Sequence, residues 1–361
     1  MLCKSYILAT LIRIAIGSNN IHNLATSNIV WQNVYDLARK QGVLAIAFDG
    51  LMKLFEQDKE FAKSFPQSLK LQWINAVFSI EQRYEKQLKV CTKLTNEWEK
   101  QGIKTLCLKG FAFSSYYPIP SHRECGDFDC YLYDNYSKGN DIAQQLGAKV
   151  DDNWYKHSEI FYHKVMIENH RYIVAVRSGK KTKELHKLLD NIAQSEGTEP
   201  IFNTKIEMPS AMFNALFMNY HSLEHFLSEG IHLRHILDWA LFIKKEQSNF
   251  DWSRFYHLCE EYNMRAFVDC ITTIAVQFFK IQIVNPQITI TSPYAKRVLI
   301  SIIEDDSAIF SQNIGAWHKR IMLIRNIFSS HWKYKAFSQQ GILSKLTSLV
   351  WGFLTHPEEQ D

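Results

Sequence analysis

Two aspartates separated by one residue, Asp127 and Asp129, are the leading candidates for chemistry in this 361-residue chain. The segment 127–133 is predicted to be a strand, in which successive side chains point to opposite faces. Asp127 and Asp129 would then project from one face, about 6.6 Å apart along the strand, while Phe128 and Cys130 face the core. Two carboxylates placed in this way can bind one or two divalent cations, Mg²⁺ or Mn²⁺, and leave coordination sites open for phosphate oxygens.

Basic residues and glycines close to the aspartate pair could bind a phosphorylated ligand. Gly110 follows a short apolar segment and would let the backbone approach a triphosphate, and Gly126 directly precedes the aspartates. Lys109 and Arg123 can neutralise phosphate charge. Lys109, Gly110, Arg123 and Gly126 are therefore predicted to bind a nucleotide. The alternative is an exposed edge strand whose acidic residues oppose aggregation.

These residues together resemble the central motif of an uncharacterised bacterial nucleotidyltransferase family in the DNA polymerase β-like superfamily. The motif consists of Leu108-Lys109-Gly110-Phe111-Ala112, Tyr116-Tyr117-Pro118, Arg123 and Gly126-Asp127-Phe128-Asp129. The similarity runs over about residues 31–255. Outside the motif it rests on Trp31, Leu37-Ala38, Gly42-Val43, Glu168-Asn169-His170, His221, His225, Leu233-Arg234 and Leu237-Asp238.

The resemblance implies transfer of a nucleoside monophosphate from a nucleoside triphosphate to an acceptor, with release of pyrophosphate. It does not identify the acceptor, which could be a small molecule, a glycan, a peptide or a protein. The superfamily usually has Gly-Ser or Gly-Gly where this chain has Lys109-Gly110, and 16 residues separate Gly110 from Asp127, which is longer than usual there. We therefore expect phosphate binding to rely more on Lys109 and Arg123 than on a serine.

A third carboxylate is expected on a later strand. Glu168 lies in a segment rich in β-forming residues, and a neighbouring strand could place it beside Asp127 and Asp129. There it would complete the metal site or activate the acceptor hydroxyl. His170 would share the face of Glu168 and is assigned to nucleotide binding. Spacing alone allows Glu168 to be a solvated strand residue equally well, and the resemblance favours the functional role.

Two other functions compete with nucleotidyl transfer. One is a catalytically silent binding or antitoxin-like module built on the same fold, against which the intact carboxylates argue. The other is a zinc hydrolase, because His221 and His225 with Glu224 fit the pattern His-x-x-Glu-His, which on a helix could bind Zn²⁺. No other part of the sequence supports zinc, so we favour core or site-lining histidines. The sequence contains no dinucleotide-binding, Walker or nucleophile-elbow motif.

The candidate residues lie in the middle of three regions. Residues 1–98 are predicted to be helical, residues 99–208 to form a nucleotidyltransferase-like α/β core with a small mixed β-sheet, and residues 209–361 to be helical again. The fold class is therefore α+β. Strands are expected at 105–108, 128–133, 159–164 and 165–176, and helices at 31–38, 43–55, 69–98, 111–117, 211–227 and 233–245.

Composition indicates a globular protein and limits its partners. The chain is 46% hydrophobic, and its net charge of +4 is too small to prove a nucleic-acid partner. The seven cysteines form no Cys-x-x-Cys pair, which fits reduced thiols in the cytoplasm. No uncharged apolar run reaches 18 residues, so we expect no transmembrane segment and a cytoplasmic location.

The stretch 307–357 contains no Asp or Glu and mixes basic with aromatic residues. Its basic residues are Lys319, Arg320, Arg325, Lys333, Lys335 and Lys345, and its aromatic residues include Trp317, Phe328, Trp332, Tyr334, Phe337 and Trp351. Such a stretch could bind RNA or an anionic membrane surface. We favour a packed amphipathic helix with a basic outer face.

Overall fold

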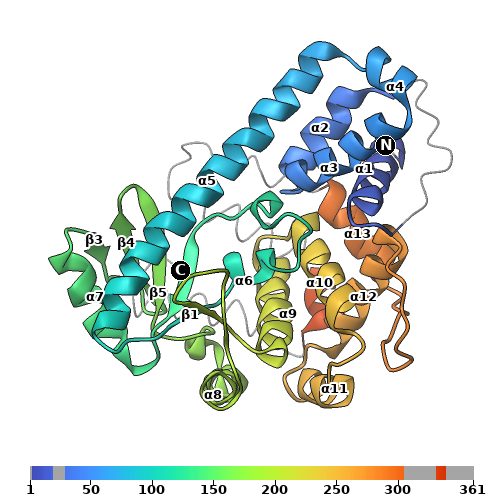
Figure 1. Ribbon diagram of the computed structural model, residues 1–361. Helices are drawn as coiled ribbons and strands as arrows, with labels where there is room; N and C mark the ends of the chain where they lie inside the picture. Colours follow the sequence, from blue (N-terminus) through green and yellow to red (C-terminus); the bar gives the residue numbers. More distant parts are fainter. Residues whose placement is uncertain (1, 19–28, 305–330, 339–361) are drawn as a thin grey trace.

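The computed structural model of the chain describes residues 2–18, 29–304 and 331–338. Helices from both ends of the chain flank a mixed β-sheet (Figure 1), and the α+β class predicted from the sequence is confirmed.

The N-terminal helices are α1 (Leu2–Ala15), α2 (Trp31–Lys40), α3 (Leu44–Gln57), α4 (Lys59–Ser64) and α5 (Gln67–Lys100). Helices α1 and α3 pack so closely that Gly50 in α3 has no room for a side chain. A Cβ added there would lie 1.9 Å from the carbonyl oxygen of Leu11 in α1. Helix α5 runs from this helical group to the sheet (Figure 1). At its start, Trp73 donates to the carbonyl of Leu44 in α3, and at its end Trp98 donates to the carbonyl of Gly139.

The central region contains the strands of the sheet and short helices between them. The strands are β1 (Thr105–Cys107), β2 (Phe128–Tyr131), β3 (Lys149–Asp151), β4 (His157–Tyr162), β5 (Val165–His170), β6 (Glu199–Pro200) and β7 (Ile206–Met208). The helices are α6 (Phe111–Ser114), η1 (Pro120–His122), η2 (Tyr133–Asn135), α7 (Tyr136–Gln145), η3 (Val176–Ser178) and α8 (Lys180–Ser195). The strand order is β3-β4-β5-β2-β1-β7-β6.

Strand β2 lies inside the sheet, between β5 and β1. It pairs in parallel with β5 and antiparallel with β1. All four of its residues are buried, including Asp129. The alternative of an exposed edge strand is therefore wrong. The strand is also shorter than the predicted 127–133, because it begins at Phe128 and ends at Tyr131.

Two other expected elements end three or more residues before their predicted ends. The helix expected over 111–117 ends at Ser114. Beyond it, the N–H groups of Tyr116 and Tyr117 donate to carbonyl oxygens three residues earlier, which is a tighter turn than that of an α-helix. Pro118 also disfavours helical geometry in the residue before it. The strand expected over 165–176 ends at His170, because the following two N–H groups both donate to the carbonyl of Lys156 and turn the chain out of the sheet.

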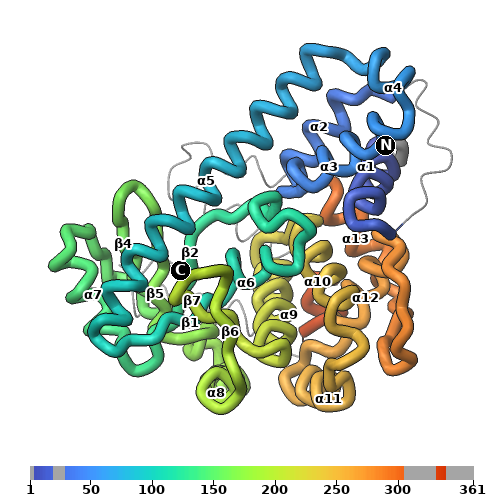
Figure 2. The backbone as a smooth tube through the Cα atoms, in the orientation of Figure 1, coloured from blue at the N-terminus to red at the C-terminus, as the bar shows by residue number. Residues whose placement is uncertain are grey.

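The C-terminal helices pack against the N-terminal ones. They are α9 (Ala211–Ser228), α10 (Leu233–Glu246), α11 (Trp252–Glu261), α12 (Arg265–Phe279), α13 (Ala295–Glu304) and α15 (His331–Phe337). Figure 2 shows the blue helices near the N-terminus beside the orange helices α12 and α13. Arg13 donates to the carbonyl of Phe278 at 2.8 Å, and Gln41 to that of Ile302 at 2.8 Å. The two ends of the chain therefore join into one helical body beside the sheet.

Only a short part of the basic aromatic stretch 307–357 lies within the described residues. There, Tyr334 and Phe337 are buried, and the ring of Trp332 lies 6.0 Å from that of Phe226 in α9. This part is packed, as the favoured interpretation expected, whereas Lys319, Arg320, Arg325 and Lys345 lie outside the described residues. Among the helices that the structure describes, none is long and apolar enough to cross a membrane.

Candidate active site

The register between β2 and β5 brings the three predicted carboxylates together. Asp129 and Glu168 are directly paired residues on these two parallel strands, and Asp127 lies one residue before β2 begins. Asp127, Asp129 and Glu168 each offer an oxygen atom, and the three atoms lie within 4.8 Å of one another. Glu168 is not a solvated strand residue, because its side chain is only 16% exposed.

Asp129 lies at the centre of the cluster and is only partly satisfied. Its Oδ1 atom lies 3.1 Å from Lys109 Nζ and 3.1 Å from His170 Nε2. Burial raises the pKa of Asp129, but Lys109 and His170 outweigh burial and hold the pKa below its ordinary value. Its other oxygen, Oδ2, is buried without a hydrogen-bond partner. A buried carboxylate oxygen of this kind is costly unless a cation or donor binds it.

The pKa of Glu168 is raised by its burial and by the neighbouring carboxylates. Burial is the largest cause that raises its pKa, to about 7, and the charges of Asp129 and Asp127 add to the rise against the hydrogen bond from His170. For the pKa of Lys109, burial and the neighbouring carboxylates act in opposite directions. Burial lowers its pKa, but the three carboxylates outweigh burial and raise it, so the ammonium group stays charged.

His170 lies among the carboxylates. Its Nδ1 atom lies 3.3 Å from the carbonyl oxygen of Tyr172, and its Nε2 atom lies between Asp129 and Glu168, 3.3 Å from the latter. Burial lowers the pKa of His170, but its hydrogen bonds to the two carboxylates outweigh burial and raise it. His170 therefore orients Asp129 and Glu168, and its predicted contact with the nucleotide stays a prediction.

His157 is a neighbour that the sequence analysis missed. It pairs with His170 across the antiparallel strands β4 and β5, and its Nε2 atom lies 3.8 Å from Glu168. His157, Glu168 and His170 form a second group whose ligand atoms lie within 4.8 Å of one another. Strand β4 has three polar residues followed by three apolar ones, so no alternation singled out His157, and its register against β5 cannot be read from one sequence.

The turn before α6 places Lys109 over the cluster. Gly110 has φ = 61°, in the region that favours glycine. The thiol of Cys107 donates to the carbonyl oxygen of Lys109 at 2.8 Å and helps to fix this turn. A Cβ added at Gly126 would meet nothing within 4 Å, so this second glycine is not sterically required.

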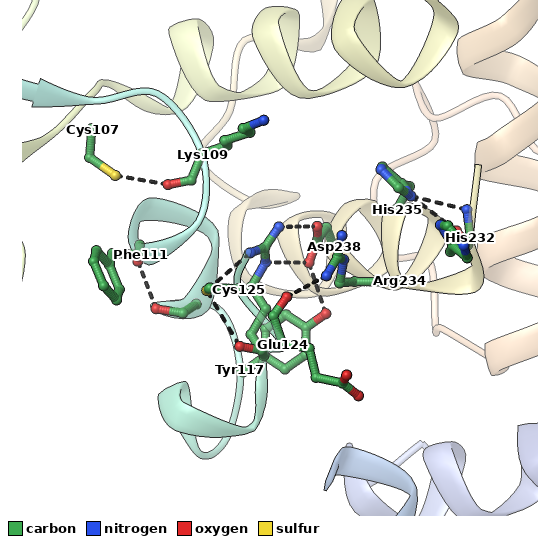
Figure 3. Close-up of polar contacts among 12 residues, drawn as sticks. Cys107, Lys109, Phe111, Tyr117, Glu124, Cys125, His232, Arg234, His235 and Asp238 are labelled. Carbon is green, nitrogen blue, oxygen red and sulfur yellow. Dashed lines mark hydrogen bonds and ion pairs between the residues drawn. The ribbon is translucent and has the colours of Figure 1, made fainter. Parts of the chain in front are cut away.

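Arg123 is engaged in a buried ion pair rather than left free. Its Nε and Nη2 atoms donate to the two oxygens of Asp238 in α10 at 2.9 and 2.8 Å. Tyr117 also donates to Asp238, at 2.8 Å (Figure 3). The side chains of Arg123 and Asp238 are 7% and 3% exposed. The pair thus joins the loop before β2 to the C-terminal helices, and the predicted contact of Arg123 with a triphosphate stays a prediction.

A pocket of about 520 Å³, part of it open to solvent, lies between the sheet and helices α9 and α10. Its lining residues on the sheet side are Lys109, Gly110, Phe113, Arg123, Glu124, Gly126 and Asp127, and those on the helix side are Met218, His221, Ser222, Arg234, His235 and Asp238. Figure 3 shows Lys109 on one side of this region and Arg234, His235 and Asp238 on the helix opposite. The pocket reaches the carboxylate cluster through Asp127.

The zinc-site alternative finds no support in the described residues. His221 stacks on Phe217, and His225 is hydrogen-bonded to Glu229. Neither histidine belongs to a group of ligand atoms close enough to hold a metal ion among the residues described. His221 lines the pocket instead, as the favoured interpretation allowed.

Comparison with known proteins agrees with the arrangement of the site. No curated protein and no solved structure matches the chain significantly. The sequence model of a family described as "Uncharacterised nucleotidyltransferase" matches residues 27–280, which include the sheet, the carboxylates and both pocket-lining helices. With carboxylates, lysine turn and pocket all inside the matched segment, the chain belongs to this uncharacterised nucleotidyltransferase family.

Proposed function

We propose that the protein is a metal-dependent nucleotidyltransferase that moves a nucleoside monophosphate from a nucleoside triphosphate to an acceptor. The observation that carries the proposal is the close grouping of Asp127, Asp129 and Glu168 beside a pocket lined by Lys109 and Gly110. Membership of a nucleotidyltransferase family supports the same chemistry. The central motif, which lies within the matched segment, also resembles that of the DNA polymerase β-like superfamily.

The cluster fits a hard divalent cation such as Mg²⁺ or Mn²⁺. Its donors are carboxylate oxygens, which these ions prefer. Three carboxylates lie beside Lys109 and His170, and the Oδ2 atom of Asp129 is buried without a partner, so the cluster has room for a further positive charge. Asp127, Asp129 and Glu168 would hold the cation, which when bound supplies positive charge for phosphate oxygens.

Lys109 and Gly110 are assigned to the triphosphate. The raised pKa of Lys109 keeps its ammonium charged at neutral pH, and the positive φ of Gly110 turns the backbone sharply at the pocket wall. Arg123 has its charge offset by Asp238, so its main contribution is to hold the loop that carries Asp127.

In the reaction, the acceptor oxygen forms a bond to the α-phosphorus, the bond between that phosphorus and the bridging oxygen to the β-phosphorus breaks, and pyrophosphate leaves. The acceptor proton needs a base. Glu168 lies beside the cation site and can accept this proton, and its hydrogen bond with His170 keeps the carboxylate oriented. Glu168 thus has two uses, as a cation ligand and as the base.

The proposal is tested by incubating the protein with Mg²⁺ or Mn²⁺, each of the four α-labelled ribonucleoside triphosphates, and cell extract. We expect pyrophosphate release and transfer of label to one class of acceptor, measured by mass analysis. Asp127→Asn is the negative control. If the wild-type protein binds a triphosphate but releases no pyrophosphate with any extract, the silent-module alternative replaces the proposal.

A further inference from the structure

Arg234 is a pocket-lining guanidinium that makes no ion pair within the described part of the chain. Among the residues that the structure describes, no carboxylate oxygen lies within 4.0 Å of it, whereas Arg123 in the same pocket is paired with both oxygens of Asp238. Arg234 donates through Nη1 to the carbonyl oxygen of Glu124, and its Nε atom is buried with no hydrogen-bond partner (Figure 3). An unpartnered buried guanidinium nitrogen is costly and indicates a missing acceptor.

Several elements hold Arg234 in place before any ligand binds. Its backbone N–H donates to the carbonyl of Gln41 at the end of α2, and the side-chain oxygen of Gln41 accepts from the neighbouring residue Leu233. Its aliphatic atoms lie about 3.6 Å from where a Cβ on Gly42 would be. The guanidinium is therefore presented to the pocket by α10 with support from the N-terminal helices. Such preorganisation lowers the entropic cost of binding an anion.

The chemistry of the pocket indicates which anion would fit. Lys109, Gly110 and Asp127 line the pocket on the sheet side and Arg234 lines it from α10. In the proposed reaction the α-phosphorus lies at the carboxylates, so the other two phosphates must extend away from them. A guanidinium forms paired hydrogen bonds with phosphate oxygens, and a ligand that passes Lys109 would reach Arg234 with these outer phosphates.

We propose that Arg234 binds the β- or γ-phosphate of the nucleoside triphosphate, an inference that rests on the proposed function. The C-terminal helical region is then part of the nucleotide site, and not only a support for the sheet. The Nε atom and the free Nη donors of Arg234 contact phosphate oxygens, and Nη1 keeps its bond to Glu124. The ligand class recognised at this position is an oligophosphate, independent of the base.

The test compares ligands that differ in phosphate number. Binding of tripolyphosphate, of the four ribonucleoside triphosphates and of their monophosphates is measured by calorimetry in Mg²⁺ for the wild type, Arg234→Gln and Arg254→Gln. Arg254 pairs with Glu196 outside the pocket, so Arg254→Gln removes an equal charge elsewhere. We expect Arg234→Gln to weaken tripolyphosphate and triphosphate binding by about 10- to 100-fold, the usual value of a charge-assisted hydrogen bond, and monophosphate binding by less than about threefold.

Binding of triphosphates by Arg234→Gln within twofold of the wild type would overturn the inference. So would an equal loss for monophosphates and triphosphates, which is the result expected if Arg234 only supports the fold. Arg234→Lys keeps the charge but lacks Nε, and a triphosphate affinity between those of Arg234→Gln and the wild type supports the inference if Arg234→Gln does not fold. A wild-type protein that binds no triphosphate would instead overturn the proposed function itself.

Discussion

Two groups of charged side chains lie at the pocket, and their charges are paired to different degrees. In the first, Arg123 and Asp238 share two hydrogen bonds and Tyr117 caps one of the Asp238 oxygens. In the second, Asp127, Asp129 and Glu168 outnumber the nearby cations, and Asp129 keeps one buried oxygen without a partner. Complete pairing is what a structural link between two parts of a fold requires, whereas surplus charge of one sign indicates a missing ligand.

The comparison predicts opposite consequences for the two groups when a charge is removed. A charge removed from the paired group leaves its partner buried and alone, so stability should fall. A charge removed from the surplus group relieves repulsion, so function should fall while stability changes little. The predictions below test this contrast.

The largest effect is expected for Asp127→Asn. It removes a carboxylate from the cation site without leaving a buried cation unpaired. Turnover should fall by more than about 10³-fold, beyond the 10- to 100-fold typical of residues that only support a metal ligand. The free energy of unfolding, measured with urea, should stay within about 1 kcal/mol of the wild type. A variant with wild-type turnover would show that the cation site lies elsewhere.

Glu168→Gln tests the residue with two assigned uses. It keeps the size of the side chain and removes its charge and basicity. Turnover should fall by about 10²–10⁴-fold, the usual contribution of a general base, while triphosphate binding measured by calorimetry should survive.

His170→Asn is the matched control for Glu168→Gln. It removes the hydrogen bonds to Asp129 and Glu168 but leaves all three carboxylates. The turnover of His170→Asn should fall by only about 10- to 100-fold. Wild-type turnover in Glu168→Gln would mean that a different residue takes the proton, and the assignment of Glu168 would be abandoned.

Asp238→Ala tests the paired group. It leaves the Arg123 guanidinium buried without its carboxylate, which typically costs about 3–5 kcal/mol. Urea unfolding should show this loss of stability. The double variant Arg123→Met with Asp238→Leu removes both charges and should be closer to the wild type in stability than Asp238→Ala is. If the single and double variants are equally destabilised, the ion pair is not what the C-terminal helices depend on.

The order of helices and strands and the carboxylates of the site could be predicted from the sequence. Apolar spacing located helices such as α2, and the Gly-Asp-x-Asp run following Lys109-Gly110 located the site. Both signals are local, because they depend on neighbours along the chain. The family resemblance then added Glu168, which spacing alone could not distinguish from a solvated residue.

The contacts that decide the role of each charged residue could not be predicted from the sequence. Arg123 and Asp238 are 115 positions apart, and Arg234 meets Glu124 across 110. The pairing of His157 with His170 depends on how β4 and β5 align. No local spacing encodes such contacts, so the sequence assigned Arg123 to phosphate and gave Arg234 no role. Both arginines line the pocket, but the fold brings a carboxylate into an ion pair with Arg123 and a backbone carbonyl into contact with Arg234.

A third group of charges, His122 with Asp49 and Glu81, should stabilise the fold to an extent that depends on pH. His122 Nδ1 lies 2.8 Å from Asp49 and Nε2 lies 2.9 Å from Glu81, which links α3 to α5 through η1. Burial lowers the pKa of His122, but the two carboxylates outweigh burial and raise it above its ordinary value of about 6.5. Because the folded-state pKa is raised, the added stability is fully present below the unfolded pKa and is lost as pH rises through the folded pKa.

His122→Gln should therefore cost most in mildly acid solution. The glutamine can hydrogen-bond but cannot be charged, so at pH 6 the variant should be less stable than the wild type by about 1.5–3 kcal/mol, the usual net value of hydrogen bonds to a charged group. The difference should shrink as pH rises through the folded-state pKa of His122, because the wild type then loses the charge that the glutamine lacks. Urea unfolding at several pH values measures it. A difference that stays constant from pH 6 to pH 9 would mean that His122 acts through packing alone, and that its two carboxylates are satisfied by water.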